Sequence, residues 1–174
     1  MTTTYLPTTL GARPDSLSTL SGAVVLRRLC SADRSAVLCH LLRLSDQDRQ
    51  MRFCQAFPDA AVAAYVAKMK FENDASFGLF DRDGCLIAIA ETFDCDNGGN
   101  RIVEAAFSTN ADWRHKGLAT TLFHHVVEYA RDKNIQRVIA QCLAVNYAMR
   151  ALLRSVGLAS KVGDGEVCGE LILN

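Results

Sequence analysis

Two features of the sequence have the residue types to move a proton and to hold a phosphate. Glu104 stands in an otherwise apolar run, where an unpaired carboxylate is costly to bury, so it is a candidate general base. Residues 114–119 read R-H-K-G-L-A, which fits the pattern R/Q-x-x-G-x-G/A. Their small residues let a ligand approach the backbone closely, and their basic residues add positive potential for a diphosphate.

A strand, a turn and a helix must position these residues. Residues 102–109 are rich in β-branched and small side chains, which favours a strand, and residues 110–116 are polar, as in a turn. From Gly117 onward, apolar residues recur at helical spacing. The first N–H groups of a helix lack internal partners and lie at the positive end of its dipole, so they suit a phosphate. A plain turn before a helix would have the same composition, and that alternative stays open.

The composition is that of an ordinary globular domain. The chain has 174 residues, of which 49% are apolar, and its 19 basic residues balance its 19 acidic ones. We expect one domain at residues 23–174, preceded by a flexible tail at residues 1–22 that is rich in Thr, Ser and Pro. A net charge of zero gives no general attraction to nucleic acid, and no apolar run approaches the roughly 20 residues that span a bilayer. We therefore expect neither a nucleic-acid nor a membrane partner.

The cysteines, the histidines and the charge pattern add weaker indications. Seven cysteines without C-x-x-C spacing favour reduced thiols in a cytoplasmic protein over a disulfide or zinc framework. His124 and His125 lie within the predicted helix, and we expect them to be packed or exposed helix residues, with no metal bound. Residues 72–96 carry seven carboxylates against one arginine, which indicates either solvated loops or an acidic rim that attracts a cationic amine.

The rest of the chain predicts a mixed α/β order of elements. Residues 137–143 read as a strand that follows a crossover helix, so this strand should lie parallel to residues 102–109. Ser45 and Asn146 are candidate caps at the starts of two further helices. The other expected strands are 23–29, 76–80, 85–93, 159–162 and 167–173, and the other expected helices lie near 31–43 and 59–70.

Three separated motifs resemble the GNAT acetyltransferase superfamily. Residues 102–135 are similar to its motif A, in which a strand leads into a turn that holds the diphosphate of acetyl-CoA. Residues 44–53 read L-S-D-Q-D-R-Q-M-R-F, which resembles the L-S-x-x-x-R-x-x-R-F segment of the bacterial protein-lysine acetyltransferase type. Residues 146–158 resemble the segment N-x-x-M-x-x-L-x-x-x-x-G-F, with Leu158 in place of Phe. The motifs occur in the family's order, and the resemblance covers residues 23–173.

The resemblance implies the GNAT acyl-CoA N-acyltransferase fold. This is a mixed sheet of six or seven strands with flanking helices, in which two strands splay apart to admit the pantetheine arm of acetyl-CoA. It also implies transfer of the acetyl group to a primary amine by direct attack, with a protein lysine or a small molecule as the acceptor. The alternative is a non-catalytic module that binds acetyl-CoA as a sensor. The sequence leaves open which acceptor is used and whether the domain forms a homodimer.

The resemblance also implies roles for particular residues. A lysine amine with a pKa near 10.4 is neutral in only about one molecule in 2,500 at pH 7, so a general base is expected. Glu104 matches the glutamate of the family's A-E-x-A-x-x-V segment and is the first candidate, acting directly or through water; Glu91 is the second. The implied coenzyme-binding residues are Phe107, Ser108, Thr109, Arg114, His115, Lys116, Gly117, Leu118, Ala119, Thr120, Asn146 and Met149.

Two of these implied roles have alternatives. Asn146 is equally well explained as a helix cap. Leu153 stands where many members of the family have a tyrosine that protonates the leaving thiolate, a residue that the protein-acetyltransferase type also lacks. The sequence therefore does not identify the acid, and a thiol with a pKa near 8.5 can leave unaided or through water.

Overall fold

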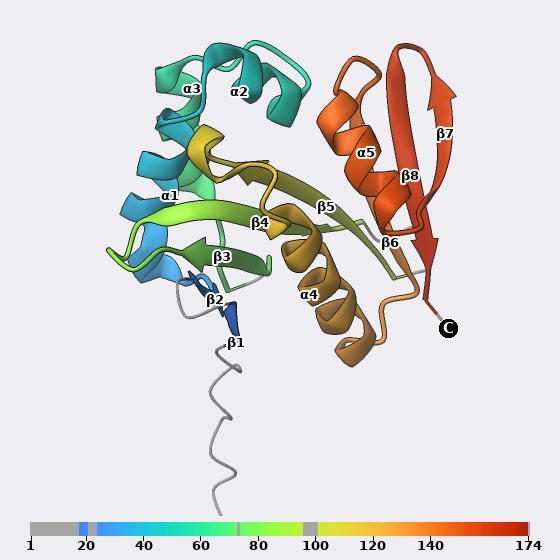
Figure 1. The fold of residues 1–174 in the computed structure, drawn as a ribbon, viewed down its shortest axis with the longest axis horizontal. Helices are drawn as coiled ribbons and strands as arrows, with labels where there is room; N and C mark the ends of the chain where they lie inside the picture. The colour runs from blue at the N-terminus through green and yellow to red at the C-terminus, as the bar shows by residue number, and fades with distance from the viewer. Residues whose placement is uncertain (1–17, 21–23, 73, 96–100, 174) are drawn as a thin grey trace, which may run out of the picture.

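The computed structural model describes residues 18–20, 24–72, 74–95 and 101–173, whose strands form one mixed sheet (Figure 1). The eight strands lie in the order β1-β2-β3-β4-β5-β6-β8-β7, and all neighbours are antiparallel except β5 and β6, which are parallel. The mixed α/β class and the parallel pair predicted from the sequence are thus confirmed. The strands are β1 (Ser18–Leu20), β2 (Val24–Arg28), β3 (Ser76–Phe80), β4 (Leu86–Asp94), β5 (Ile102–Thr109), β6 (Arg137–Leu143), β7 (Ala159–Gly163) and β8 (Glu166–Ile172).

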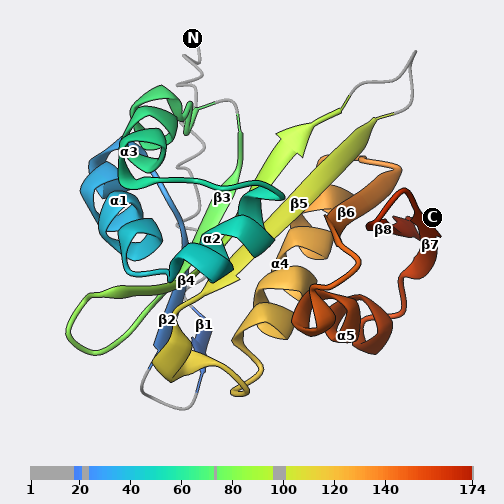
Figure 2. The same ribbon diagram turned by 90° about the horizontal axis from the view of Figure 1, so that it is seen from above.

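Helices cover both faces of the sheet (Figure 2). α4 and α5 pack on one face over a core that includes Leu122, Phe123 and Leu153, and α1 and α3 pack on the other face over a core that includes Leu41 and Val62. None of the helices that the structure describes is long and apolar enough to cross a membrane. The helices are α1 (Arg34–Leu42), α2 (Asp46–Phe53), α3 (Asp59–Lys68), α4 (Leu118–Asp132) and α5 (Tyr147–Ser155), with short 3-10 turns at Ser31–Asp33 and Ala111–Trp113.

The sheet has one strand more than the six or seven expected. The extra strand is β1, which pairs with β2 from Ser18↔Leu26 to Leu20↔Val24 and lies within the stretch expected to be a tail. Three residues are too few to show an alternating pattern, so composition alone assigned them to the tail. The remainder of residues 1–22 lies outside the described residues, as does most of the loop predicted between β4 and β5.

The central parallel pair diverges part of the way along β5. β5 and β6 pair at Ile102↔Arg137, Val103↔Val138 and Glu104↔Ile139, and the ladder ends there. On its other side β5 stays paired with β4 as far as Thr109. Residues 105–109 therefore have a strand partner on one side only, which is the splayed pair that the resemblance implied.

Candidate functional site

The turn between β5 and α4 presents backbone N–H groups that have no intrahelical partner. Gly117 is the N-cap of α4 with φ 77°, a conformation that glycine adopts without steric cost. The first intrahelical hydrogen bond of α4 runs from the N–H of Thr121 to the carbonyl of Gly117 at 3.0 Å, so the N–H groups of residues 118–120 lie before the bonded part of the helix. His115 also has a positive φ, 59°, and turns of this kind gather N–H groups into anion-binding concavities.

The basic side chains of this turn are exposed, and two of them contact neighbouring side chains. The guanidinium of Arg114 forms an ion pair with Asp48 of α2 at 2.7 Å. The ammonium of Lys116 lies 4.5 Å from the centre of the Trp113 ring. Both keep a positive charge close to the start of α4, and Arg114 connects the turn to the helix on the opposite face of the sheet.

The backbone of β5 alternates between its two neighbours. The N–H of Asn110 donates to Ile87 and the carbonyl of Ile102 accepts from Cys95, so even-numbered residues of β5 direct their backbone groups toward β4. Phe107 and Thr109 therefore direct theirs toward the open side, where β6 has diverged. Ser108, which the resemblance grouped with them, directs its backbone toward the β4 ladder.

The side chain of Ser108 has a partner that sequence reasoning missed. His40 of α1 is 1% exposed, with Nε2 at 2.8 Å from the hydroxyl of Ser108 and Nδ1 at 3.2 Å from the carbonyl of Leu86. Burial lowers the pKa of His40 to about 4, so the ring is neutral near pH 7. Nδ1–H then donates to Leu86, and Nε2 accepts from Ser108. His40 was not singled out from the sequence, since no local pattern around it indicates a contact with Ser108.

Glu104 is the last residue of β5 that pairs with β6 before the two strands diverge. It is half-buried and lies directly across from Phe93 of β4, so its side chain is on the face covered by α1, α2 and α3. It forms no ion pair with any residue that the structure describes. Burial and the nearby charge of Glu104 raise the pKa of the Cys95 thiol, which keeps that thiol protonated beside the carboxylate.

Both carboxylate oxygens of Glu91, the second candidate base, already have partners. Its side chain is 1% exposed; one oxygen accepts a hydrogen bond from the hydroxyl of Tyr65 at 2.7 Å, and the other pairs with Arg52. Burial, and then the charge of Glu91, raise the pKa of the Tyr65 hydroxyl, which therefore stays protonated as a donor. Glu91 joins α2 and α3 to β4, and this arrangement favours Glu104 as the carboxylate available for proton transfer.

The residues implied on α5 have clear structural roles. The Oδ1 atom of Asn146 accepts from the N–H of Met149 at 3.0 Å, which is the helix cap, and its Nδ2 donates to the carbonyl of Met51 at 3.4 Å. Leu153 is fully buried in the core beneath α5. Tyr147 is 73% exposed, so no tyrosine of α5 occupies the place of the family's acid.

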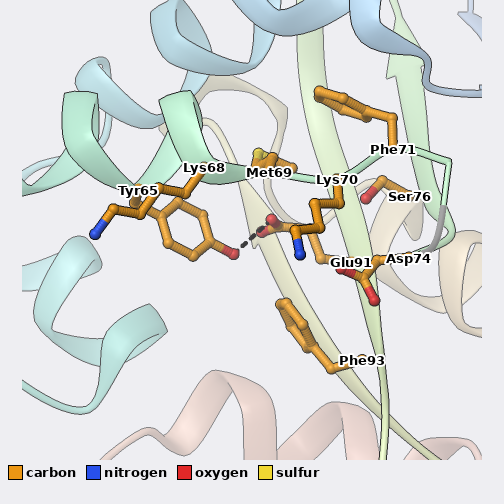
Figure 3. A pocket seen from close by; sticks show the side chains of 9 residues that line it. All are labelled: Tyr65, Lys68, Met69, Lys70, Phe71, Asp74, Ser76, Glu91 and Phe93. Carbon is orange, nitrogen blue, oxygen red and sulfur yellow. Dashed lines mark hydrogen bonds between the residues drawn. The ribbon is translucent and has the colours of Figure 1, made fainter.

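A cavity of about 150 Å³ lies between α3, the loop that follows it, and strands β3 and β4 (Figure 3). We call it the α3–β4 cavity. Tyr65, Met69, Phe71 and Phe93 give it a mostly apolar lining, and Glu91, bonded to the hydroxyl of Tyr65, lines it as well. In the part of the chain that the structure describes, no group of three or more His, Cys, Asp and Glu side chains is placed to hold a metal ion.

Comparison with known proteins gives one family and many similar folds. The family model of the acetyltransferase (GNAT) domain matches residues 23–159. No curated protein matches. The GNAT domain of S. lividans PAT is 23% identical with a TM-score of 0.77, and the match covers 86% of this chain and 90% of that one.

Two similar structures have names that state an acceptor. The ribosomal-protein-S5-alanine acetyltransferase from Vibrio fischeri is 11% identical with a TM-score of 0.70, over 91% of this chain and 97% of that one. The ribosomal-protein-alanine N-acetyltransferase from Brucella melitensis is 19% identical with a TM-score of 0.65, over 85% and 99%. At these identities the likeness concerns the fold.

Proposed function

Because the chain belongs to the acetyltransferase (GNAT) domain family, we propose that it transfers the acetyl group of acetyl-CoA to a primary amine. The observation that carries the proposal is the divergence of β5 and β6 directly after Glu104, beside the free N–H groups at the start of α4. One edge of β5 is left without a strand partner, and a thioester carbonyl needs hydrogen-bond donors of that kind when an oxyanion forms.

The residues around the divergence fit the coenzyme. The N–H groups of residues 118–120 and the charges of Arg114, His115 and Lys116 suit its diphosphate. The outward-facing backbone of Phe107 and Thr109 suits the amides of the pantetheine arm, as one more strand would. The amide of Asn146 and the side chain of Met149, at the start of α5, are proposed to contact the same arm.

Glu104 is proposed as the general base. The acceptor reaches the site mostly as an ammonium, and about 4.6 kcal/mol separates it from the reactive amine at pH 7. Glu104 takes that proton, directly or through one water, and the amine nitrogen then forms its bond to the thioester carbon. The carbon–sulfur bond breaks as the tetrahedral intermediate collapses and the thiolate leaves unaided. The second proton that the nitrogen loses passes to the thiolate, directly or through water.

The test measures thiol release from acetyl-CoA with lysine peptides and small primary amines as acceptors. Glu104→Gln should lower kcat by about 10²- to 10⁴-fold and leave the Kd for acetyl-CoA within about twofold, because the base acts on the acceptor. Glu128→Gln, an exposed glutamate on α4, is the matched control and should behave as the wild type. Full turnover in Glu104→Gln would contradict the assignment.

A second candidate function is that of a non-catalytic acetyl-CoA sensor. Leu153 is fully buried where many members of the family have a tyrosine acid, but the protein-acetyltransferase type also lacks this tyrosine, so Leu153 fits both functions. A sensor would gain thermal stability from acetyl-CoA and release no thiol with any acceptor in the panel. Thiol release that depends on Glu104 would exclude it.

A further inference from the structure

The α3–β4 cavity lies on the same face of the sheet as Glu104. Phe93 lines the cavity and is the direct cross-strand neighbour of Glu104. Glu91 also lines it and stands opposite Ala106, within the part of β5 that β6 has left. Side chains directly opposite one another in an antiparallel pair lie on one face, and adjacent strands are about 4.8 Å apart. The cavity is therefore one strand away from the proposed site of acetyl transfer.

The lining of the cavity suits an apolar group rather than an ammonium. Its apolar walls come from Tyr65, Met69, Phe71 and Phe93, and the polar residues Lys68, Lys70, Asp74 and Ser76 also line it (Figure 3). The carboxylate of Glu91 has both oxygens occupied, by Tyr65 and by Arg52, and its charge is balanced by the buried guanidinium. Asp74 also lines the cavity, but so do Lys68 and Lys70, so a cation that enters would lose its hydration and meet two ammonium groups beside one carboxylate, which is unfavourable.

The volume of the cavity sets the size of that group. A cavity of about 150 Å³ lined by apolar side chains is large enough to bind benzene. One aromatic ring would fill this cavity, and a linker of two or three carbons covers about the spacing between adjacent strands, from β4 to Glu104 on β5.

We propose that the α3–β4 cavity binds the aromatic ring of the acceptor, which is an arylalkyl primary amine whose amino group reaches Glu104. The inference rests on the proposed acetyl transfer and specifies its acceptor. A polyamine or an isolated lysine side chain has no group to fill the cavity.

The test compares 3-phenylpropylamine with propylamine, which differ only in the ring. Calorimetric titration of the full-length protein, with and without coenzyme A, should give a Kd about tenfold to a hundredfold lower for the ring-bearing amine, because burying a phenyl group is worth that much. The kcat/KM for acetyl transfer should show the same preference. Equal affinity for the two amines, or turnover confined to spermidine or lysine peptides, would overturn the proposal.

A cavity-filling variant tests whether the preference for the ring-bearing amine comes from the α3–β4 cavity. Met69→Trp places a larger side chain in the cavity from the loop after α3, and it should abolish the preference for the ring. Val162→Trp, at an exposed position of β7, is the control and should keep the preference. A preference that persists in Met69→Trp would show that the ring binds elsewhere.

Failure of ring binding in the α3–β4 cavity can be distinguished from failure of acetyl transfer. If 3-phenylpropylamine binds tightly, Met69→Trp abolishes this, and no thiol is released, then the cavity is confirmed and acetyl transfer to this amine is wrong. If lysine peptides are acetylated and the ring gives no advantage, then the acetyltransferase function stands and the acceptor class is wrong. The matched amines decide the question on the wild-type protein even if the variant does not fold.

Discussion

The two sides of β5 differ in how completely their polar groups are paired. Toward β4 the ladder runs the length of the strand, Ser108 is bound by His40, and Glu91 on the neighbouring strand is fully buried and bonded on both oxygens. Toward β6 the ladder stops at Glu104, a half-buried carboxylate without an ion pair among the described residues. Two carboxylates on one face, one strand apart, thus have opposite surroundings.

The contrast separates groups that hold the fold from groups available for chemistry. A buried carboxylate whose two oxygens both have donors is fixed in its orientation, so it is not free to approach a substrate. A carboxylate at the end of a ladder can approach a substrate and take its proton. We therefore expect substitutions on the β4 side to change stability and substitutions on the β6 side to change turnover or coenzyme binding.

The largest effect on stability is expected at Glu91. Glu91→Gln removes the charge that balances Arg52, whose side chain is 8% exposed, and an uncompensated buried charge costs about 3–5 kcal/mol. Glu104→Gln breaks no ion pair with the residues that the structure describes and should lower the free energy of unfolding by less than about 1 kcal/mol. Urea unfolding of the two variants checks both values. Equal losses would show that the two carboxylates do not differ as proposed.

The next largest effect is a pH dependence that comes from His40. Burial lowers its pKa to about 4 from 6.5, so between these values the unfolded chain binds a proton that the folded protein does not. Stability should therefore fall as the pH drops from 6.5 to 4, by about 3 kcal/mol in all, and His40 should contribute no slope above pH 6.5. His40→Gln should remove this part of the slope, as measured by chemical unfolding at several pH values. An unchanged slope would mean that His40 is not held neutral.

Local patterns in the sequence predicted the elements and their caps, whereas contacts between distant residues could not be predicted. The bounds of β3, β5 and β6 and the caps at Ser45 and Asn146 follow from local patterns, and the structure has them where the sequence placed them. The splayed pair came from the family resemblance, because divergence depends on how distant elements pack. The partners of Glu91 and Ser108 lie 26 to 68 residues away in sequence, and no local pattern encodes such contacts.

Asp48, whose side chain pairs with Arg114 in the turn before α4, should weaken coenzyme binding. It holds Arg114 at 2.7 Å in a partly exposed ion pair, and its negative charge lies close to the proposed diphosphate site. Asp48→Asn should make the Kd for coenzyme A about threefold to tenfold lower at low salt, with the gain shrinking as salt rises. Stability should fall by no more than about 1 kcal/mol. Asp132→Asn, at the far end of α4, is the control. Weaker binding by Asp48→Asn would instead mean that Asp48 orients Arg114 toward the diphosphate.

An effect of the same size on coenzyme binding decides between the two explanations of Asn146. Serine is also a good N-cap, so Asn146→Ser should keep the bond to Met149 and change the free energy of unfolding by less than about 0.5 kcal/mol. It removes the amide proposed to contact the pantetheine arm, so the Kd for coenzyme A should rise about threefold to tenfold, the loss of one hydrogen bond. Ser45→Asn exchanges the same two residues at the cap of α2 and should change neither quantity. If Asn146→Ser binds coenzyme A as the wild type does, capping and the link to Met51 account for Asn146 fully, and the open side of β5 would lose one of its proposed ligands.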